Sequence, residues 1–130
     1  MKENNQVLQK SKAFAVRIVR LYQYLTEEKK EKVLSRQVLR SGTSIGANVK
    51  ESIRAQSTAD FLSKKQISLK EASETEYWLE LLTETDYITE KAADSLLNDC
   101  RELIRLLTSI IRTSKENNQL KLYEMINPDF

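Results

Sequence analysis

Histidine is absent from this 130-residue chain. Without it there can be no Ser-His-Asp or Cys-His catalysis and no HExxH zinc site. Phosphate-binding loops are also absent, because Gly42 and Gly46 fit neither GxxxxGK[ST] nor GxGxxG. The sequence therefore predicts a protein that is not an enzyme, with no catalytic residue, no metal site and no cofactor.

Cysteine and long hydrophobic runs are equally scarce. Cys100 is alone, so no internal disulfide can form, and its place in an apolar helical pattern predicts a buried, inert thiol. No apolar run exceeds four residues, and no positively charged leader precedes a hydrophobic segment. We therefore expect a cytoplasmic protein without a membrane span.

The composition suits long amphipathic helices. Only one proline, two glycines and 7% aromatic residues are present, against 31% charged residues. Apolar residues recur at three- and four-residue steps in four stretches, which predict helices over about residues 6–26, 33–55, 58–85 and 90–113. A polar tail over 114–130 follows, and its apolar residues could dock back or contact a partner.

Connections of only a few residues force consecutive helices to run antiparallel. The expected fold is an all-α, antiparallel up-down-up-down four-helix bundle, formed by residues 1–130 as one domain.

A helical apolar pattern runs through both glycines. Val38, Gly42, Ile45 and Val49 lie at three- and four-residue steps. Each glycine costs a helix interior about 1 kcal/mol relative to alanine, so two are plausible only where another helix packs closely against them. The alternative is that residues 41–43 form a loop between two short helices.

Carboxylates interrupt the apolar stripes of the third predicted helix, in the stretch EASETEYWLELL. A buried carboxylate without a partner is costly, so Glu71, Glu74 or Glu76 should meet a cation or donor on the second helix. Two alternatives are that all three point to solvent, or that they form a catalytic or metal-binding pair. The residues assigned to structural ion pairing and packing are Arg36, Arg40, Gly42, Gly46, Asn48, Glu71, Glu74, Glu76 and Trp78.

Charge is distributed unevenly along the chain. The total is only +2, but residues 1–54 carry +7, residues 55–99 carry −6 and residues 100–130 carry +1. Such a pattern can serve internal pairing, contacts between subunits or binding of an anionic polymer; ordinary solvated helix faces are the remaining explanation. The candidate nucleic-acid-binding residues are Lys10, Lys12, Arg17, Arg20, Lys29, Lys30, Lys32, Arg36 and Arg40.

Several strings carry a family resemblance. They are FAVRIVRLYQYL (14–25), VLSRQVLRSGTSIGANVKESIRAQS (33–57), DFLSKKQISLKEASETEYWLELL (60–82) and DYI (86–88). Over roughly residues 14–112 the chain resembles the four-helix-bundle proteins encoded within intervening sequences of bacterial 23S rRNA genes. This resemblance implies a ring-like homopentamer with no known catalytic activity. The family is in turn similar to the accessory variability determinant of diversity-generating retroelements, a basic pentamer that binds nucleic acid and a reverse transcriptase.

Two functions remain open at this point. One is a homo-oligomeric accessory protein that binds RNA or DNA through the basic surfaces of the first two helices. The other is a protein-interaction scaffold without a nucleic-acid ligand, in which the uneven charge serves assembly alone.

Overall fold

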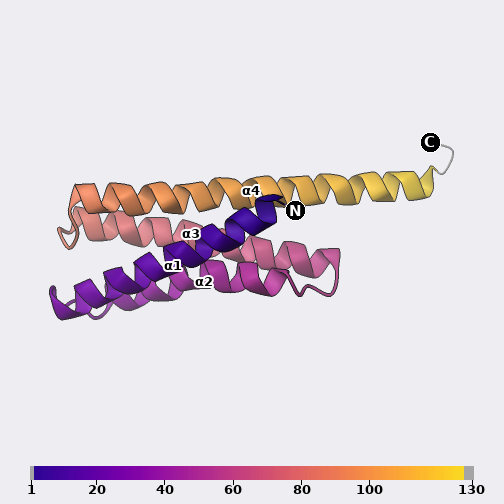
Figure 1. Ribbon diagram of the computed structural model, residues 1–130. Coiled ribbons are helices and arrows are strands. Elements are labelled where there is room, and N and C mark those ends of the chain that lie inside the picture. Colours follow the sequence, from indigo (N-terminus) through magenta and orange to yellow (C-terminus); the bar gives the residue numbers. More distant parts are fainter. Residues whose placement is uncertain (1, 128–130) are drawn as a thin grey trace.

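The computed structural model describes residues 2–127, and these form four α-helices and no strand (Figure 1). The helices are α1 (Lys2–Glu27), α2 (Leu34–Ser52), α3 (Thr58–Glu84) and α4 (Glu90–Ile126). The expected all-α class with four helices is confirmed.

The helices pack as a bundle in the cycle α1, α2, α3, α4 and back to α1. Between α1 and α2 the contacts run in opposite order along the two helices. Ile18 of α1 lies at Gly42 of α2, and Ser11 lies at Gly46. The largest buried side chains in the shared core come from all four helices and include Phe14, Ile45, Leu79 and Leu103.

Helix α2 runs without interruption through both glycines. A Cβ atom on Gly42 would lie 2.8 Å from both Cγ1 and Cγ2 of Ile18, which is completely buried. A Cβ on Gly46 would lie 3.3 Å from the carbonyl oxygen of Ser11. The glycines therefore let the backbone of α2 approach α1 closely, and no loop forms at residues 41–43.

The other side of α2 meets α3 through hydroxyl groups. Ser68 of α3 donates a hydrogen bond to the carbonyl oxygen of Ile45 at 2.8 Å. Oγ1 of Thr75 and Oγ of Ser41 share a hydrogen bond of 2.9 Å. All three hydroxyl-bearing residues are fully buried. Because each hydroxyl has a partner, the polar interface avoids the cost of unsatisfied buried groups.

The buried face of α3 differs from the stripes that the sequence suggested. Its buried residues are Lys65, Ser68, Ala72, Thr75, Leu79 and Leu82. Ile67, an apolar residue of the same helix, is 38% exposed. Two hydroxyl-bearing residues of this face, Ser68 and Thr75, make the hydrogen bonds to α2.

The helix ends also differ from the sequence-based bounds. Helix α1 begins at Lys2, α2 ends at Ser52, and α4 continues to Ile126, where the sequence predicted a polar tail from residue 114. Loss of the apolar pattern does not end a helix, and residues 114–126 contain neither glycine nor proline. In Figure 1 this part of α4 projects beyond the other helices. Residues 128–130 of the predicted tail lie outside the described residues.

Replacing Gly42 with alanine should destabilise the protein by about 1–3 kcal/mol, because overpacking against Ile18 exceeds the gain of about 1 kcal/mol in helix propensity. Urea denaturation measures the change. The matched control is Ala47→Gly at an exposed position of the same helix, which should cost about 1 kcal/mol. A Gly42→Ala variant as stable as the natural protein would contradict the close contact.

Candidate nucleic-acid interface

Three of the nine candidate cations form ion pairs with other helices. Nζ of Lys10 lies 2.9 Å from Oε1 of Glu102, and Nη1 of Arg17 lies 2.6 Å from Oδ2 of Asp99, both on α4. Arg40 pairs with carboxylates of α3. These three cations are engaged in contacts between helices.

The other six cations are exposed, and none forms an ion pair with a residue in 2–127. They are Lys12, Arg20, Lys29, Lys30, Lys32 and Arg36. The last four belong to the α1–α2 connection and the first turn of α2, where Lys30 adopts a positive φ of 56°. The structure thus gathers part of the predicted basic surface at one end of the bundle.

Three carboxylates accompany this basic end. Glu27 and Glu28 are exposed, whereas Glu31 accepts hydrogen bonds from the amides of Val33 (3.2 Å) and Ser35 (2.8 Å) at the start of α2. Burial opposes ionisation of Glu31, but these backbone hydrogen bonds outweigh it and lower its pKa. Glu31 therefore acts as a cap for α2, and its charge faces the positive end of that helix dipole.

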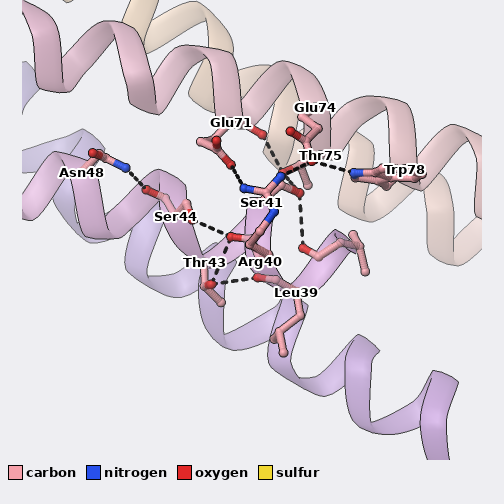
Figure 2. Close-up of polar contacts among 11 residues, drawn as sticks. Leu39, Arg40, Ser41, Thr43, Ser44, Asn48, Glu71, Glu74, Thr75 and Trp78 are labelled. Carbon is pink, nitrogen blue, oxygen red and sulfur yellow. Dashed lines mark hydrogen bonds and ion pairs between the residues drawn. The ribbon is translucent and has the colours of Figure 1, made fainter. Parts of the chain in front are cut away.

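Arg40 bridges α2 to two carboxylates of α3 (Figure 2). Its Nη1 lies 3.0 Å from Oε2 of Glu71, and its Nη2 donates to Oε2 of Glu74. The same oxygen of Glu74 accepts a hydrogen bond of 2.9 Å from Nε1 of Trp78. The Trp78 hydrogen bond, followed by Arg40, lowers the pKa of Glu74, and the hydrogen bond with Glu74 raises the pKa of Arg40. This arrangement is an ion-pair network between helices.

Three other residues that the sequence assigned to ion pairing and packing do not join the network of Arg40, Glu71 and Glu74. Arg36 is exposed and pairs with no carboxylate in residues 2–127. Nδ2 of Asn48 donates to the carbonyl oxygen of Ser44 on its own helix. Glu76 meets Arg101 of α4, whose Nε lies 2.8 Å from Oε2, and this hydrogen bond raises the pKa of Arg101. The third carboxylate thus binds α3 to α4, since it lies on the side of α3 turned away from α2.

The single thiol of the sequence lies in the core of the bundle. Cys100 is fully buried, and its Sγ lies 3.2 Å from the carbonyl oxygen of Ala72. Burial raises its pKa to about 12, so the nucleophilic thiolate is strongly disfavoured. Across residues 2–127, no three potential ligands among cysteines and carboxylates come together as a metal site.

Lys65 is a notable residue that sequence reasoning missed. It is only 1% exposed and makes neither an ion pair nor a hydrogen bond with any residue in 2–127. Its Nζ lies 5.1 Å from the ring centroid of Phe61, a cation–π contact. Burial lowers the pKa of Lys65 to about 8. The one available signal was its spacing, because residues 61, 65, 68, 72, 75 and 79 follow a helical core pattern.

The family model of the 23S rRNA-intervening sequence proteins matches residues 3–109. The chain belongs to this family. No curated protein matches the chain. A solved structure that does match is a crystal structure from Bacteroides thetaiotaomicron, described as a protein of unknown function from the S23 ribosomal protein family. It is 58% identical, with a TM-score of 0.84, and the match covers 85% of this chain and 98% of that chain.

The C-terminal part of α4 lies beyond the match to the 23S rRNA-intervening sequence family. Its apolar residues include Leu120, Leu122, Met125 and Ile126, which are 49–78% exposed. None of the helices in residues 2–127 combines the length and hydrophobicity of a membrane span.

Replacing Lys65 with methionine should stabilise the protein at pH 7 by about 1–3 kcal/mol, because it removes a charge that is costly to bury. Below pH 8 lysine is protonated in both the folded and the unfolded state, so its full cost is present. Between pH 8 and about 10.5 the folded state releases the proton first, and the cost falls.

Urea denaturation at pH 7 and pH 10 tests this expectation. The stability difference between Lys65→Met and the natural protein should be larger at pH 7. Lys64→Met is the neighbouring control, because Lys64 is less buried and pairs with Glu51 at 3.4 Å. An equal stability difference at both pH values would contradict a lowered pKa of Lys65 in the folded protein.

Proposed function

We propose that this protein is a non-enzymatic, homo-oligomeric accessory protein that binds RNA or DNA through exposed basic residues of α1, α2 and their connection. The observation that carries the proposal is the group Lys29, Lys30, Lys32 and Arg36, which we term the basic end. All four side chains are exposed and none has an internal ion pair within residues 2–127. Free cations of this kind can reach phosphate groups without breaking contacts that hold the bundle together.

Oligomerisation is an essential part of the proposal. Glu27, Glu28 and Glu31 lie in the same stretch, so the charge excess at each basic end is small. Several copies on one surface would multiply weak contacts through avidity. The unit would be an antiparallel up-down-up-down bundle in the cytoplasm, and a ring-like homopentamer is the assembly that the family resemblance implies.

The direct test is a quadruple variant in which Lys29, Lys30, Lys32 and Arg36 are replaced by glutamine. Titration into labelled structured RNA should show affinity that falls steeply with salt for the natural protein. The variant should bind at least about tenfold more weakly at low salt, with a shallower salt dependence, because each phosphate contact contributes about one unit to that slope.

A control variant with the same net charge distinguishes the basic end from charge alone. It carries glutamine at four exposed cations of α4, namely Lys91, Arg105, Arg112 and Lys115. This control should retain most of the affinity. Absence of binding by the natural protein at about 50 mM salt would eliminate the proposed function.

A second candidate function, a protein-interaction scaffold, is favoured by the exposed apolar end of α4. Leu122, Met125 and Ile126 lie at three- and four-residue steps, so they share one helix face. Exposed side chains of this size are typical of surfaces that receive another polypeptide.

If the protein is a scaffold of this kind, replacing Leu122, Met125 and Ile126 with serine should abolish co-purification of a protein partner from the native host. Glu124→Ser, at an exposed position on the same segment, should retain the partner. Mass spectrometry of the purified complexes makes the comparison. If the partner still co-purifies with the triple variant, the apolar end of α4 is not its binding surface.

A further inference from the structure

The projecting part of α4 forms one wall of a large hollow at the end of the bundle opposite the basic end. Two adjoining cavities of about 510 and 520 Å³ share Asn4, Thr58, Phe61 and Ser114 as lining residues. The first cavity extends along α4 beside Asn117, Asn118 and Lys121, and the second reaches the α2–α3 connection and Lys65. Their size suits a small molecule.

Lys65 supplies a cation at the base of the second cavity. Its side chain is 99% buried, lines the cavity and has no anionic partner in residues 2–127. Desolvation is the sole cause of its lowered pKa, so no neighbouring carboxylate balances the charge. Buried ammonium groups are normally paired, and an anion entering from the cavity would provide the missing partner.

Asn4 of α1 supplies a second unsatisfied group at the cavities. Its Oδ1 is buried and accepts no hydrogen bond from any residue in 2–127. Such an atom is uncommon in a folded protein and calls for a donor. Asn4 lines both cavities and Lys65 lines the second, so a turn of the buried amide toward the cavity would offer this oxygen to an N–H or O–H group of a ligand at Lys65.

The first turn of α3 completes the polar surroundings. Oγ of Ser57 accepts from the amide of Asp60, and its carbonyl oxygen accepts from the amide of Phe61. The amides of Thr58 and Ala59 have no acceptor within the helix, as is usual for the first residues of a helix. Thr58 lines both cavities, and the positive end of the helix dipole therefore favours an anion there.

We propose that this hollow binds a small organic anion whose phosphate or carboxylate group pairs with Lys65 at the start of α3 and whose donor group bonds to Asn4. The ring of Phe61 covers the lysine and would exclude water from the ion pair. Lys2 and Lys121 line the outer cavity and attract an anion, although Glu3 lies there too.

The hollow is independent of the proposed nucleic-acid surface. Helix α2 has 19 residues, so the basic end and the α2–α3 connection are about 28 Å apart at 1.5 Å per residue. The wall formed by Thr113, Ser114, Asn117, Asn118 and Lys121 lies beyond the residues that the family model matches. The C-terminal part of α4 thus supplies a pocket wall from outside the matched segment.

Isothermal titration calorimetry with inorganic phosphate, with acetate and with glycerol 3-phosphate tests the proposal at constant ionic strength. At least one of these probes should bind saturably to the full-length protein. Lys65→Met should weaken that binding ~10-fold or more, since a charge-assisted hydrogen bond is lost. Lys64→Met, one residue away and paired with Glu51, should bind as the natural protein does.

Three further results distinguish the parts of the proposal. Asn4→Ala should weaken glycerol 3-phosphate, which carries hydroxyl donors, more than acetate, which carries none. Preference for acetate over phosphate would identify a carboxylate ligand, and the reverse a phosphate ester. No saturable binding of any probe, or equal binding by Lys65→Met, would overturn the proposal while leaving RNA binding at the basic end untouched.

Discussion

The close approach of α1 to α2 at Gly42 is the constraint on which the rest of the bundle depends. Ile18 occupies the space where any other residue would place its Cβ, and Ser11 lies similarly close to Gly46. Helix α2 buries only three large aliphatic side chains, Val38, Ile45 and Val49, beside serine and glycine. Its stability therefore comes from dense backbone contact with neighbouring helices more than from large apolar side chains.

The α3 side of α2 is held by hydrogen bonds. Ser68 and Thr75 of α3 bond directly to α2, and the buried leucines Leu79 and Leu82 follow on the same helix. Lys65 follows the same spacing one turn closer to the helix start, but the α2 backbone offers it no acceptor. Buried polar groups between the helices have hydrogen-bond partners along the middle of the bundle. At the end where the cavities open, Lys65 and Oδ1 of Asn4 have none within residues 2–127.

The sequence predicted features that depend on the apolar pattern of a single helix, or on the free-energy cost of burying a charged side chain without a partner. The apolar period identified α2 as a continuous helix. The cost of burying carboxylates predicted a partner on α2 among Arg36, Arg40 and Asn48, and of these only Arg40 pairs with Glu71 and Glu74. The partner of Glu76 was missed because it depends on how α4 is rotated about its axis, which no local pattern fixes. Lys65 was missed because lysine in a helix normally faces water.

Ion pairs between helices reduce the positive charge that the first half of the chain can offer to a polyanion. Lys10, Arg17 and Arg40 are matched by carboxylates of α3 and α4, so part of the positive charge of the first two helices is neutralised by ion pairs between helices. Four cations then remain at the basic end against Glu27, Glu28 and Glu31, an excess of one charge per chain. A single copy would hold a polyanion weakly, since non-specific affinity grows with the number of phosphates neutralised. Under the proposed function, binding through this surface requires an assembly that places several basic ends side by side, and we expect oligomeric state and nucleic-acid affinity to rise or fall together.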